Sequence, residues 1–208
     1  MLKLFFKNPL KNFGKLNAIY FRCGFMRIIG GFLKNQSLKT PARTATRPTS
    51  EKLRQSVFNI CQHHVEKAQF LDLFAGSGAM GIEALSRGAA KATFIEKNPL
   101  AIKTLRENLH NLNLSPLSIL YAGDVFTLIH KLKGKSFDLI YIDPPYEKGL
   151  AEKTLALVDS LHLLHVEGLL FLEESGNKEL VFSKLTHLEV KRKRKMGSTF
   201  LYEIIGKT

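Results

Sequence analysis

The sequence has few cysteines and no long apolar run, and both shortages narrow what the protein can be. Its 208 residues include only Cys23 and Cys61, which are too few for a secreted disulfide framework and have no partners at metal-ligand spacing. No apolar stretch approaches the roughly 18–20 residues that span a bilayer. We therefore expect a cytoplasmic protein with reduced thiols, no bound metal and no membrane partner.

Acidic residues are scarce relative to basic ones. The 31 Lys and Arg residues outnumber the 18 Asp and Glu residues, which gives a formal net charge of +13. Net charge can serve solubility alone, but Lys and Arg also supply most of the non-specific affinity for nucleic acid by neutralising phosphates. The charge therefore favours a polyanionic partner, with a membrane surface as the main alternative.

The first 25 residues carry five basic residues and no acidic one. Their apolar stretch is too short for the core of a signal peptide, and Pro9 and Gly14 interrupt any helix. Two interpretations are open: a flexible basic arm that helps to hold RNA, or a non-essential extension upstream of a natural start at Met26. We slightly favour the extension and expect residues 1–25 to be disordered.

A small β-hairpin is predicted next. Strand-like pieces at residues 27–31 and 37–40 flank a polar turn, and Pro41 and Pro48 then bracket a linker. A helix follows with Cys61 on its apolar stripe, so this cysteine is expected in the core rather than at a reactive site. We expect the hairpin and linker to occupy residues 26–48.

Residues 49–208 then alternate between strand and helix signals. Strands are predicted at residues 69–74, 92–95, 118–121, 138–142, 169–172, 188–193 and 199–205. Helices are predicted at residues 79–87, 99–111, near 125–133 and at 151–164. This order indicates an α/β domain with a Rossmann-like, seven-stranded sheet, mostly parallel with one antiparallel strand. Such sheets bind ligands at the carboxyl ends of their strands.

One predicted strand runs into the sequence DLFAGSGAMG, which begins at Asp72 and continues as a helix. Gly76, Gly78 and Gly81 fit the spacing of a dinucleotide-binding turn, and Glu96 ends the next strand. NAD and S-adenosylmethionine both need such glycines and such a carboxylate. Asp72 distinguishes the two cofactors, because a carboxylate at this position would repel the diphosphate of NAD and attract the ammonium or sulfonium of S-adenosylmethionine.

A second motif follows the predicted strand at residues 138–142. Asp143 and the two prolines Pro144 and Pro145 form a group rich in hydrogen-bond acceptors, because proline has no N–H. Such a group suits an exocyclic amino group, which has two donors, and holding both hydrogens frees the nitrogen lone pair to attack a methyl sulfonium. Tyr146 supplies a flat face on which a base can stack.

Three further stretches narrow the identification: RIIGG at residues 27–31, TRPTS at 46–50 and GSGAMGIEALSRG at 76–88. With the motif at 143–146, they resemble the RsmD family of bacterial 16S rRNA guanine-N2 methyltransferases. The resemblance covers about residues 26–205, and the Arg-Pro-Thr segment is its most specific part.

The resemblance implies S-adenosylmethionine as the cofactor, 16S rRNA or the assembling small subunit as the partner, and a monomer. It assigns cofactor contacts to Asp72, Phe74, Ala75, Gly76, Ser77, Gly78, Glu96, Asp124 and Val125. Within that set, Glu96 would bind the ribose and Asp124 the adenine amino group. The catalytic residues would be Asp143, Pro144, Pro145 and Tyr146, and Arg47 and Thr49 would close over the site.

Residues 191–195 form an unbroken basic run. Lysines often protect an exposed edge strand, but with the net charge the run is equally consistent with RNA contact through Lys191, Arg192 and Lys193. Other functions fit less well. A DNA adenine-N6 methyltransferase shares the Asp-Pro-Pro-Tyr chemistry and is the main alternative, although it would need a recognition domain. An NAD-dependent oxidoreductase leaves the second motif unexplained, and a non-catalytic RNA-binding module leaves both unexplained.

Overall fold

The computed structural model describes residues 25–41, 51–145, 149–175, 180, 182 and 185–207. Its strands are β1 (Phe25–Arg27), β2 (Ser37–Lys39), β3 (Gln69–Asp72), β4 (Lys91–Glu96), β5 (Ser118–Ala122), β6 (Phe137–Ile142), β7 (Leu164–Ser175), β8 (Leu188–Met196) and β9 (Thr199–Gly206). Its helices are α2 (Glu51–Ile60), α3 (Ala79–Ser86), α4 (Pro99–Asn111), α5 (Val125–Leu128) and α6 (Leu150–Ser160), with 3-10 turns η2 (Ser115–Leu117) and η3 (Ile129–Leu132).

Seven strands form one sheet in the order β5-β4-β3-β6-β7-β9-β8. Strands β5, β4, β3, β6 and β7 pair in parallel, whereas β9 pairs antiparallel with both β7 and β8. Strand β9 is therefore the one reversed strand of this sheet. The predicted fold class, a mostly parallel seven-stranded sheet with one antiparallel strand, is confirmed.

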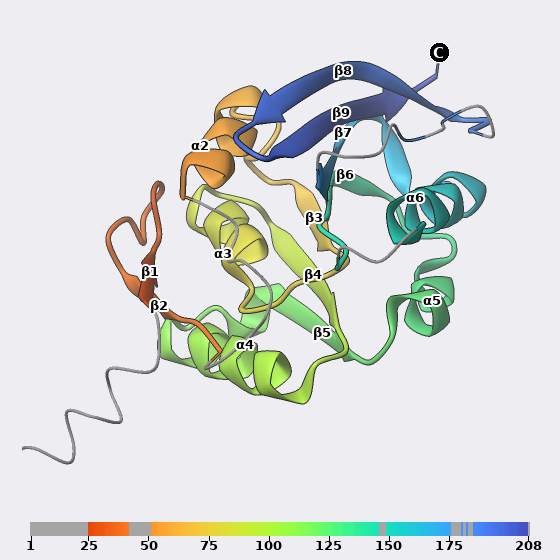
Figure 1. The fold of residues 1–208 in the computed structure, drawn as a ribbon. Coiled ribbons are helices and arrows are strands. Elements are labelled where there is room, and N and C mark those ends of the chain that lie inside the picture. Colours follow the sequence, from red (N-terminus) through yellow and green to blue (C-terminus); the bar gives the residue numbers. More distant parts are fainter. Residues whose placement is uncertain are drawn as a thin grey trace, which may run out of the picture.

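Helices cover both faces of the sheet because its strands bury side chains on both sides. In β6, Leu139 and Tyr141 belong to one core, whereas Ile140 and Ile142 belong to the other. Helices α2, α3 and α4 pack on the first face, and α5 and α6 pack on the second (Figure 1). An apolar strand such as β6 is typical of this doubly covered arrangement.

Helix α4 shows how local sequence sets an element's limits. Asn98 caps its start, since its side chain accepts hydrogen bonds from the N–H groups of Leu100 and Ala101 at 2.9 and 3.2 Å. Pro99 occupies the first turn, where its missing N–H costs nothing. The helix has the predicted bounds, and it buries Leu105 against the first face of the sheet.

Other boundaries differ from those predicted. The strand expected over residues 69–74 ends at Asp72, and the helix expected near residues 125–133 is the short α5 followed by η3. The helix expected over residues 151–164 stops at Ser160, because His162 adopts a positive φ of 52°. Strand β7 then begins at Leu164 and is longer than expected, since Gly168 and charged residues obscure its apolar pattern.

The predicted hairpin is present as a two-stranded antiparallel sheet of β1 and β2, and it buries Ile28 and Leu38 in the first core. Its first strand, expected over residues 27–31, instead covers Phe25–Arg27. Figure 1 shows it beside α3 and α4. The predicted domain limits at residues 25/26 and 48/49 stay predictions, because residues 1–24 and 42–50 lie outside the described part of the chain. Among the described helices, none combines the length and apolar composition needed to cross a membrane.

Candidate functional site

Four carboxylates stand at the carboxyl ends of four adjacent strands. In spatial order they are Asp124 after β5, Glu96 at the end of β4, Asp72 at the end of β3 and Asp143 after β6. The chain places β3, β4 and β5 in succession and then returns to the other side of β3 with β6, so the sheet order reverses between β3 and β6. Ligands of such sheets bind at this reversal point.

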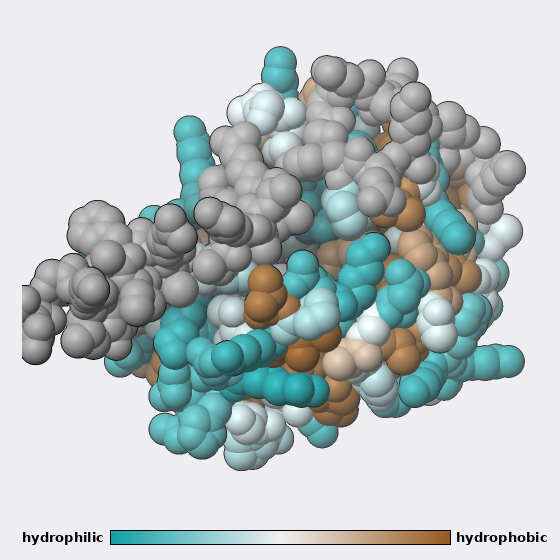
Figure 2. Space-filling view, turned by 60° about the horizontal axis from the view of Figure 1, so that its bottom comes forward, coloured by the Kyte–Doolittle hydropathy of each residue, from teal (hydrophilic) through white to brown (hydrophobic). Residues whose placement is uncertain are grey.

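The loops that follow β4 and β5 run along the lower edge of the molecule in Figure 1. Figure 2 turns this edge toward the viewer and shows hydrophobic side chains near the middle of the face, with hydrophilic ones around them.

The three glycines of the turn after β3 differ in what requires them. A Cβ on Gly78 would lie 2.2 Å from Leu105 of α4, and a Cβ on Gly81 would lie 2.2 Å from the Phe94 ring of β4. These two glycines therefore allow α3 to pack closely. Gly76 has a φ of +55° and nothing within 4 Å of an added Cβ, so its backbone borders open space. Of the three, Gly76 is the one placed to let a ligand approach.

Glu96 fastens this turn to the next strand. One carboxylate oxygen accepts from the Gly76 N–H at 2.7 Å, and the other accepts from the Asn98 N–H at 2.7 Å. Each oxygen retains a second lone pair. Glu96 is thus oriented from both sides while it stays able to accept hydrogen bonds from ribose hydroxyls.

Asp72 is the deepest acid of the four, with 2% of its surface exposed. Burial, with the negative Glu96 nearby, raises the pKa of Asp72 to about 7, although hydrogen bonds from the N–H groups of Gly81 and Phe74 work against this. No cation in the part of the chain that the structure describes contributes to that balance. The environment therefore favours either a proton on Asp72 or a positively charged group of a ligand beside it.

The remaining residues predicted to bind the cofactor flank these acids. Asp124 caps α5 by accepting from the Phe126 N–H at 2.9 Å, and Val125 is buried behind it. In the glycine turn, the Ala75 N–H donates to the Ile95 carbonyl at 3.1 Å, and Phe74 packs against the second core. The structure thus brings the predicted cofactor residues of β3, β4 and β5 to one edge.

Asp143 lies across the reversal point from Asp72. In the β3–β6 pairing, Asp72 is opposite Tyr141, so Asp143 stands two residues further along the neighbouring strand. Asp143 and Pro145 are half-buried and Pro144 is buried. Tyr146, the fourth predicted catalytic residue, lies outside the described residues, as do Arg47 and Thr49.

Two buried polar groups at this edge were not predicted from the sequence. The Tyr141 hydroxyl donates to the Glu173 carboxylate at 2.8 Å, behind Asp143. Burial, followed by the charges of Asp143 and Glu173, raises the pKa of Tyr141 well above its ordinary value. The one signal in the sequence was a tyrosine and a glutamate inside apolar strands. This hydrogen bond joins the carboxyl-terminal part of β6 to β7 in the interior of the protein.

Asn108 of α4 is the second group. Its side-chain amide donates to the carbonyls of Ser77 and Lys39 at 3.0 Å each, and its oxygen accepts from the Lys39 N–H at 3.0 Å. Asn108 thereby holds the glycine turn to the end of β2. An asparagine on the buried side of an amphipathic helix is the signal that could have revealed it.

The basic run lies apart from the four carboxylates. Lys191, Arg192 and Lys193 are exposed on the edge strand β8, which β7 and β9 separate from β6. Lys191 approaches Glu203 at 3.6 Å, and the Lys193 ammonium lies 4.4 Å from the centre of the Phe200 ring. The run is thus an outer surface rather than part of the acidic edge.

Cys61 follows α2 and is completely buried, as predicted. Burial raises the pKa of its thiol to about 12, which keeps the thiol protonated and unreactive at neutral pH. This cysteine therefore belongs to the core.

A sheet with one reversed strand, a glycine turn after β3 and acids along its carboxyl edge define a Rossmann-like methyltransferase. A family model described as Conserved hypothetical protein 95 matches residues 26–205. The chain belongs to this family, the RsmD family.

Relatives agree with this assignment. The chain is 37% identical to Ribosomal RNA small subunit methyltransferase D of Escherichia coli K12 over 72% of this chain and 75% of that protein. It is 30% identical to the protein of the same name from Buchnera aphidicola (subsp. Acyrthosiphon pisum), over 89% and 97% of the two chains.

Solved structures share the fold. The Escherichia coli protein yhhF superposes with a TM-score of 0.78 and 31% identity, over 88% of this chain and 99% of that one. SMU.776, solved in complex with S-adenosylhomocysteine (SAH), gives a TM-score of 0.66 over 88% of this chain and 56% of that one. At 15% identity, the second likeness concerns the fold alone.

Proposed function

We propose that this methyltransferase transfers the methyl group of S-adenosylmethionine to the exocyclic N2 amino group of a guanine in 16S rRNA. The observation that carries the proposal is the placement of Asp143 and Pro144 at the end of β6, across the reversal point from Asp72. This arrangement puts an amino-group acceptor next to a candidate cofactor site.

The described residues fit the cofactor. Asp72 is a buried carboxylate, and none of the described cations enters the balance of its pKa, which suits the ammonium of the methionine part. Glu96 and Asp124 stand at the ends of the next two strands, where they can accept from ribose hydroxyls and from the adenine amino group. When bound, S-adenosylmethionine supplies an electrophilic methyl group on a sulfonium sulfur.

Asp143 and Pro144 would act on the target nitrogen. The Asp143 carboxylate and the Pro144 carbonyl can accept the two N–H hydrogens of an exocyclic amino group. Holding both hydrogens draws the nitrogen toward tetrahedral geometry and leaves its lone pair free to attack the methyl group. The amine formed by methylation is positively charged and acidic, so its proton can leave to Asp143 or to water without a strong base. Tyr146 would supply the stacking surface for the base.

Ribosomal RNA is the substrate that charge and relatives support together. The net charge of +13 suits a polyanion, and the Escherichia coli and Buchnera relatives carry ribosomal RNA small subunit methyltransferase in their names. The exposed residues Lys191, Arg192 and Lys193 would bind phosphates away from the four carboxylates. We infer a monomer that meets the RNA with its own surface.

The test is mass spectrometry of 16S rRNA nucleosides from cells that lack the gene. We expect one N2-methylguanosine to disappear and to return when the wild-type gene is supplied, but not with Asp143→Ala. Asp138→Asn is the matched control: Asp138 lies at the opposite end of β6, where it accepts from the Gln69 N–H, and this variant should restore the modification.

The same cells test the main alternative. If N6-methyladenine in DNA disappears while 16S rRNA is unchanged, the substrate is DNA and the guanine assignment is wrong.

A further inference from the structure

A buried acid of strand β7 lies beside Asp143, the acid that follows β6. Strands β6 and β7 run parallel, and Ile142 pairs with Leu172. One step further along both strands, Asp143 therefore comes beside Glu173. Neighbouring strands of a sheet lie about 4.8 Å apart. The two carboxylates thus belong to adjacent positions at the carboxyl edge of the sheet.

Tyr141 connects these two acids. Its side chain belongs to the first core, together with that of Leu139, and its hydroxyl has a single hydrogen, which it donates to Glu173 at 2.8 Å. Burial, followed by the charges of Asp143 and Glu173, raises the pKa of Tyr141, so both carboxylates act on its hydroxyl. Tyr141 is 1% exposed and Glu173 is 6% exposed. Water therefore screens these charges only weakly.

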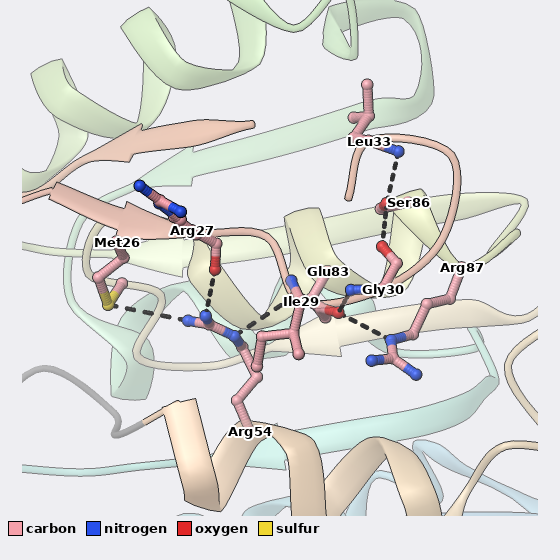
Figure 3. A network of polar contacts seen from close by, with 9 residues as sticks. All are labelled: Met26, Arg27, Ile29, Gly30, Leu33, Arg54, Glu83, Ser86 and Arg87. Atoms are coloured by element: carbon pink, nitrogen blue, oxygen red, sulfur yellow. Dashed lines mark hydrogen bonds and ion pairs between the residues drawn. The ribbon is translucent and has the colours of Figure 1, made fainter. Parts of the chain in front are cut away.

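Two further charged groups act on Tyr141 from the elements packed against it. Asp72 of β3 adds to the raised pKa of Tyr141, after burial and the two nearer acids. Arg54 of α2 also interacts with Tyr141 electrostatically. Figure 3 shows the Arg54 guanidinium directed at Glu83, 3.4 Å away, and donating to the Arg27 carbonyl. The cation of this group is therefore engaged with another acid.

Glu83 is the centre of a buried ionic network that holds the N-terminal hairpin to α2 and α3 (Figure 3). It accepts from the N–H groups of Ile29 and Gly30 at 2.8 and 2.7 Å, and Arg87 lies 2.8 Å from it. Arg54 and Glu83 are completely buried. Because Glu83 compensates the charge of Arg54, negative charge predominates among the described groups that act on Tyr141.

Negative charge at this point suits the proposed reaction. The nitrogen lone pair forms the new N–CH3 bond while the electrons of the broken S–CH3 bond stay on sulfur, and the positive charge moves to the amino group. One N–H proton then passes to Asp143. A second carboxylate beside Asp143 stabilises the positive amine, and it strengthens the hold of Asp143 on the proton because like charges disfavour the ionised form.

We propose that Tyr141 and Glu173 are positioning residues for methyl transfer and that they act through Asp143. Glu173 supplies a second negative charge beside the Asp143 carboxylate, and the Tyr141 hydroxyl holds Glu173 in that place. The proposal rests on the proposed function, because it takes Asp143 as the group that acts on the amino nitrogen.

The first test is Glu173→Gln, which keeps the size of the side chain and its ability to accept from Tyr141 but removes the charge. We expect kcat for 16S rRNA to fall roughly tenfold, because Asp143 remains but accepts the proton less readily. KM for the RNA and Kd for SAH should stay at their wild-type values, since Glu96 is the acid that adds to the raised pKa of Asp72. Single-turnover methylation and calorimetry measure these quantities.

The effect of the charge can also be measured without turnover. The NMR resonance of the Asp143 carboxyl carbon, followed against pH, should give a midpoint roughly one pH unit lower in Glu173→Gln than in wild type. Glu203→Gln is the matched control. Glu203 is also a buried acid, 5% exposed, but it lies on β9, 3.6 Å from both Lys191 and Arg194, and β7 separates it from β6. This variant should leave kcat and the midpoint unchanged.

Tyr141→Phe tests the hydroxyl while it keeps the ring in the core. We expect it to lower kcat several-fold in the wild-type background and to have no further effect in the Glu173→Gln background. The reason is that the hydroxyl acts by holding a charge that the second background lacks. A double-mutant cycle on kcat measures this coupling.

An unchanged kcat or an unchanged Asp143 midpoint in Glu173→Gln would overturn the proposal, even for a variant that unfolds at lower urea, since the pair would then have a structural role alone. Equal losses from Tyr141→Phe in both backgrounds would overturn the role of the hydroxyl. Failure of the proposed function is a separate result: the wild-type protein would then leave 16S rRNA unmethylated, whereas the Asp143 midpoint would still respond to the charge at position 173.

Discussion

A buried carboxylate lies near each end of α3, and the negative charges of these two carboxylates are balanced differently. Glu83, near the end of the helix, is completely buried between Arg54 and Arg87 and accepts from two backbone N–H groups. Asp72, near its start, is 2% exposed and has a negative neighbour, Glu96, and no cation among the described residues enters the balance of its pKa. One charge is compensated within the fold, whereas the other is not.

We interpret this difference as that between a structural charge, Glu83, and the charge of a proposed cofactor site, Asp72. A compensated charge such as Glu83 holds segments together, here the hairpin, α2 and α3, and needs nothing from outside. An uncompensated buried carboxylate disfavours the folded state when it is ionised, and it is retained where a ligand supplies the missing charge. The cofactor's ammonium would do for Asp72 what two arginines do for Glu83.

Removing the compensated charge should have the largest effect. We expect Glu83→Ala to lower the free energy of unfolding by roughly 3–5 kcal/mol, because the buried Arg54, the half-buried Arg87 and two N–H groups lose their partner. Urea denaturation measures this. The control is Glu107→Gln, which breaks the exposed pair with Lys39 and should leave the midpoint unchanged. An unchanged midpoint for Glu83→Ala would mean that the network does not hold the hairpin.

The Asp143→Ala variant tests whether Asp143 acts in methyl transfer but not in cofactor binding. Asp143→Ala should lower kcat by about 10²–10³, since a positioned acceptor for the reacting group is lost. The dissociation constant for SAH should stay near the wild-type value, because Asp143 acts on the target nitrogen. Single-turnover methylation and calorimetry give the two numbers. A variant that binds SAH much more weakly, or turns over normally, contradicts this division.

Asp72→Asn should have opposite effects on stability and on binding. The pKa of Asp72 is raised to about 7 in the folded state, so its favourable contribution is fully present below about pH 4 and is lost as pH rises through 7. Asparagine carries no charge. We therefore expect the variant to be more stable than wild type above pH 7, by roughly 2–4 kcal/mol, and equally stable near pH 4. Urea titrations across pH measure the difference.

Cofactor binding supplies the other half of this prediction. Because an ammonium group favours ionised Asp72, wild-type affinity for SAH should rise as pH increases toward 7 and then level off, with proton uptake by the buffer below pH 7. Asp72→Asn should bind weakly at every pH. Calorimetry in buffers of different ionisation enthalpy tests this, and a pH-independent wild-type affinity would mean that Asp72 does not meet the ammonium.

The smallest effect concerns cations that are not buried. Arg54 and Arg87 are committed to Glu83, whereas Lys191, Arg192 and Lys193 face solvent on β8. Replacing these three by alanine should weaken rRNA binding and reduce the salt slope by roughly 2, without a change in the methylated nucleotide. Filter binding across salt concentrations and primer-extension mapping are the measurements. A shifted methylation site would show that the run also takes part in base selection.

The sequence predicted the elements whose signals are local. Helix α4 was placed correctly because Asn98, Pro99 and an apolar period mark it within one stretch of chain. The end of α6 and the start of β7 were misplaced, because the positive φ of His162 has no strong local signal and because Gly168 interrupts the strand pattern. The Glu83 network was missed entirely, since its partners come from three separate segments.

What the sequence determined by itself was the fold class, and it also predicted the chemistry of two motifs. A glycine turn after a strand that ends in an acid, and Asp-Pro-Pro-Tyr after another strand, predict cofactor binding and amino-group methylation through residue types and short spacings. The alternation of strands and helices fixed a doubly wound sheet. These features depend on groups that are neighbours in the chain, so no knowledge of distant contacts was needed.

Only the tertiary structure decided which groups meet. It reversed the strand order between β3 and β6 and so brought Asp72 and Asp143 to neighbouring strand ends. It also joined Ser77 to Lys39 through Asn108. Glu83 lies beside two arginines, whereas no cation of the described residues enters the balance of the pKa of Asp72. Strand pairing and burial join residues far apart in the chain, and a carboxylate's protonation depends on what surrounds it in space. The difference between the two buried acids is therefore a property of the fold.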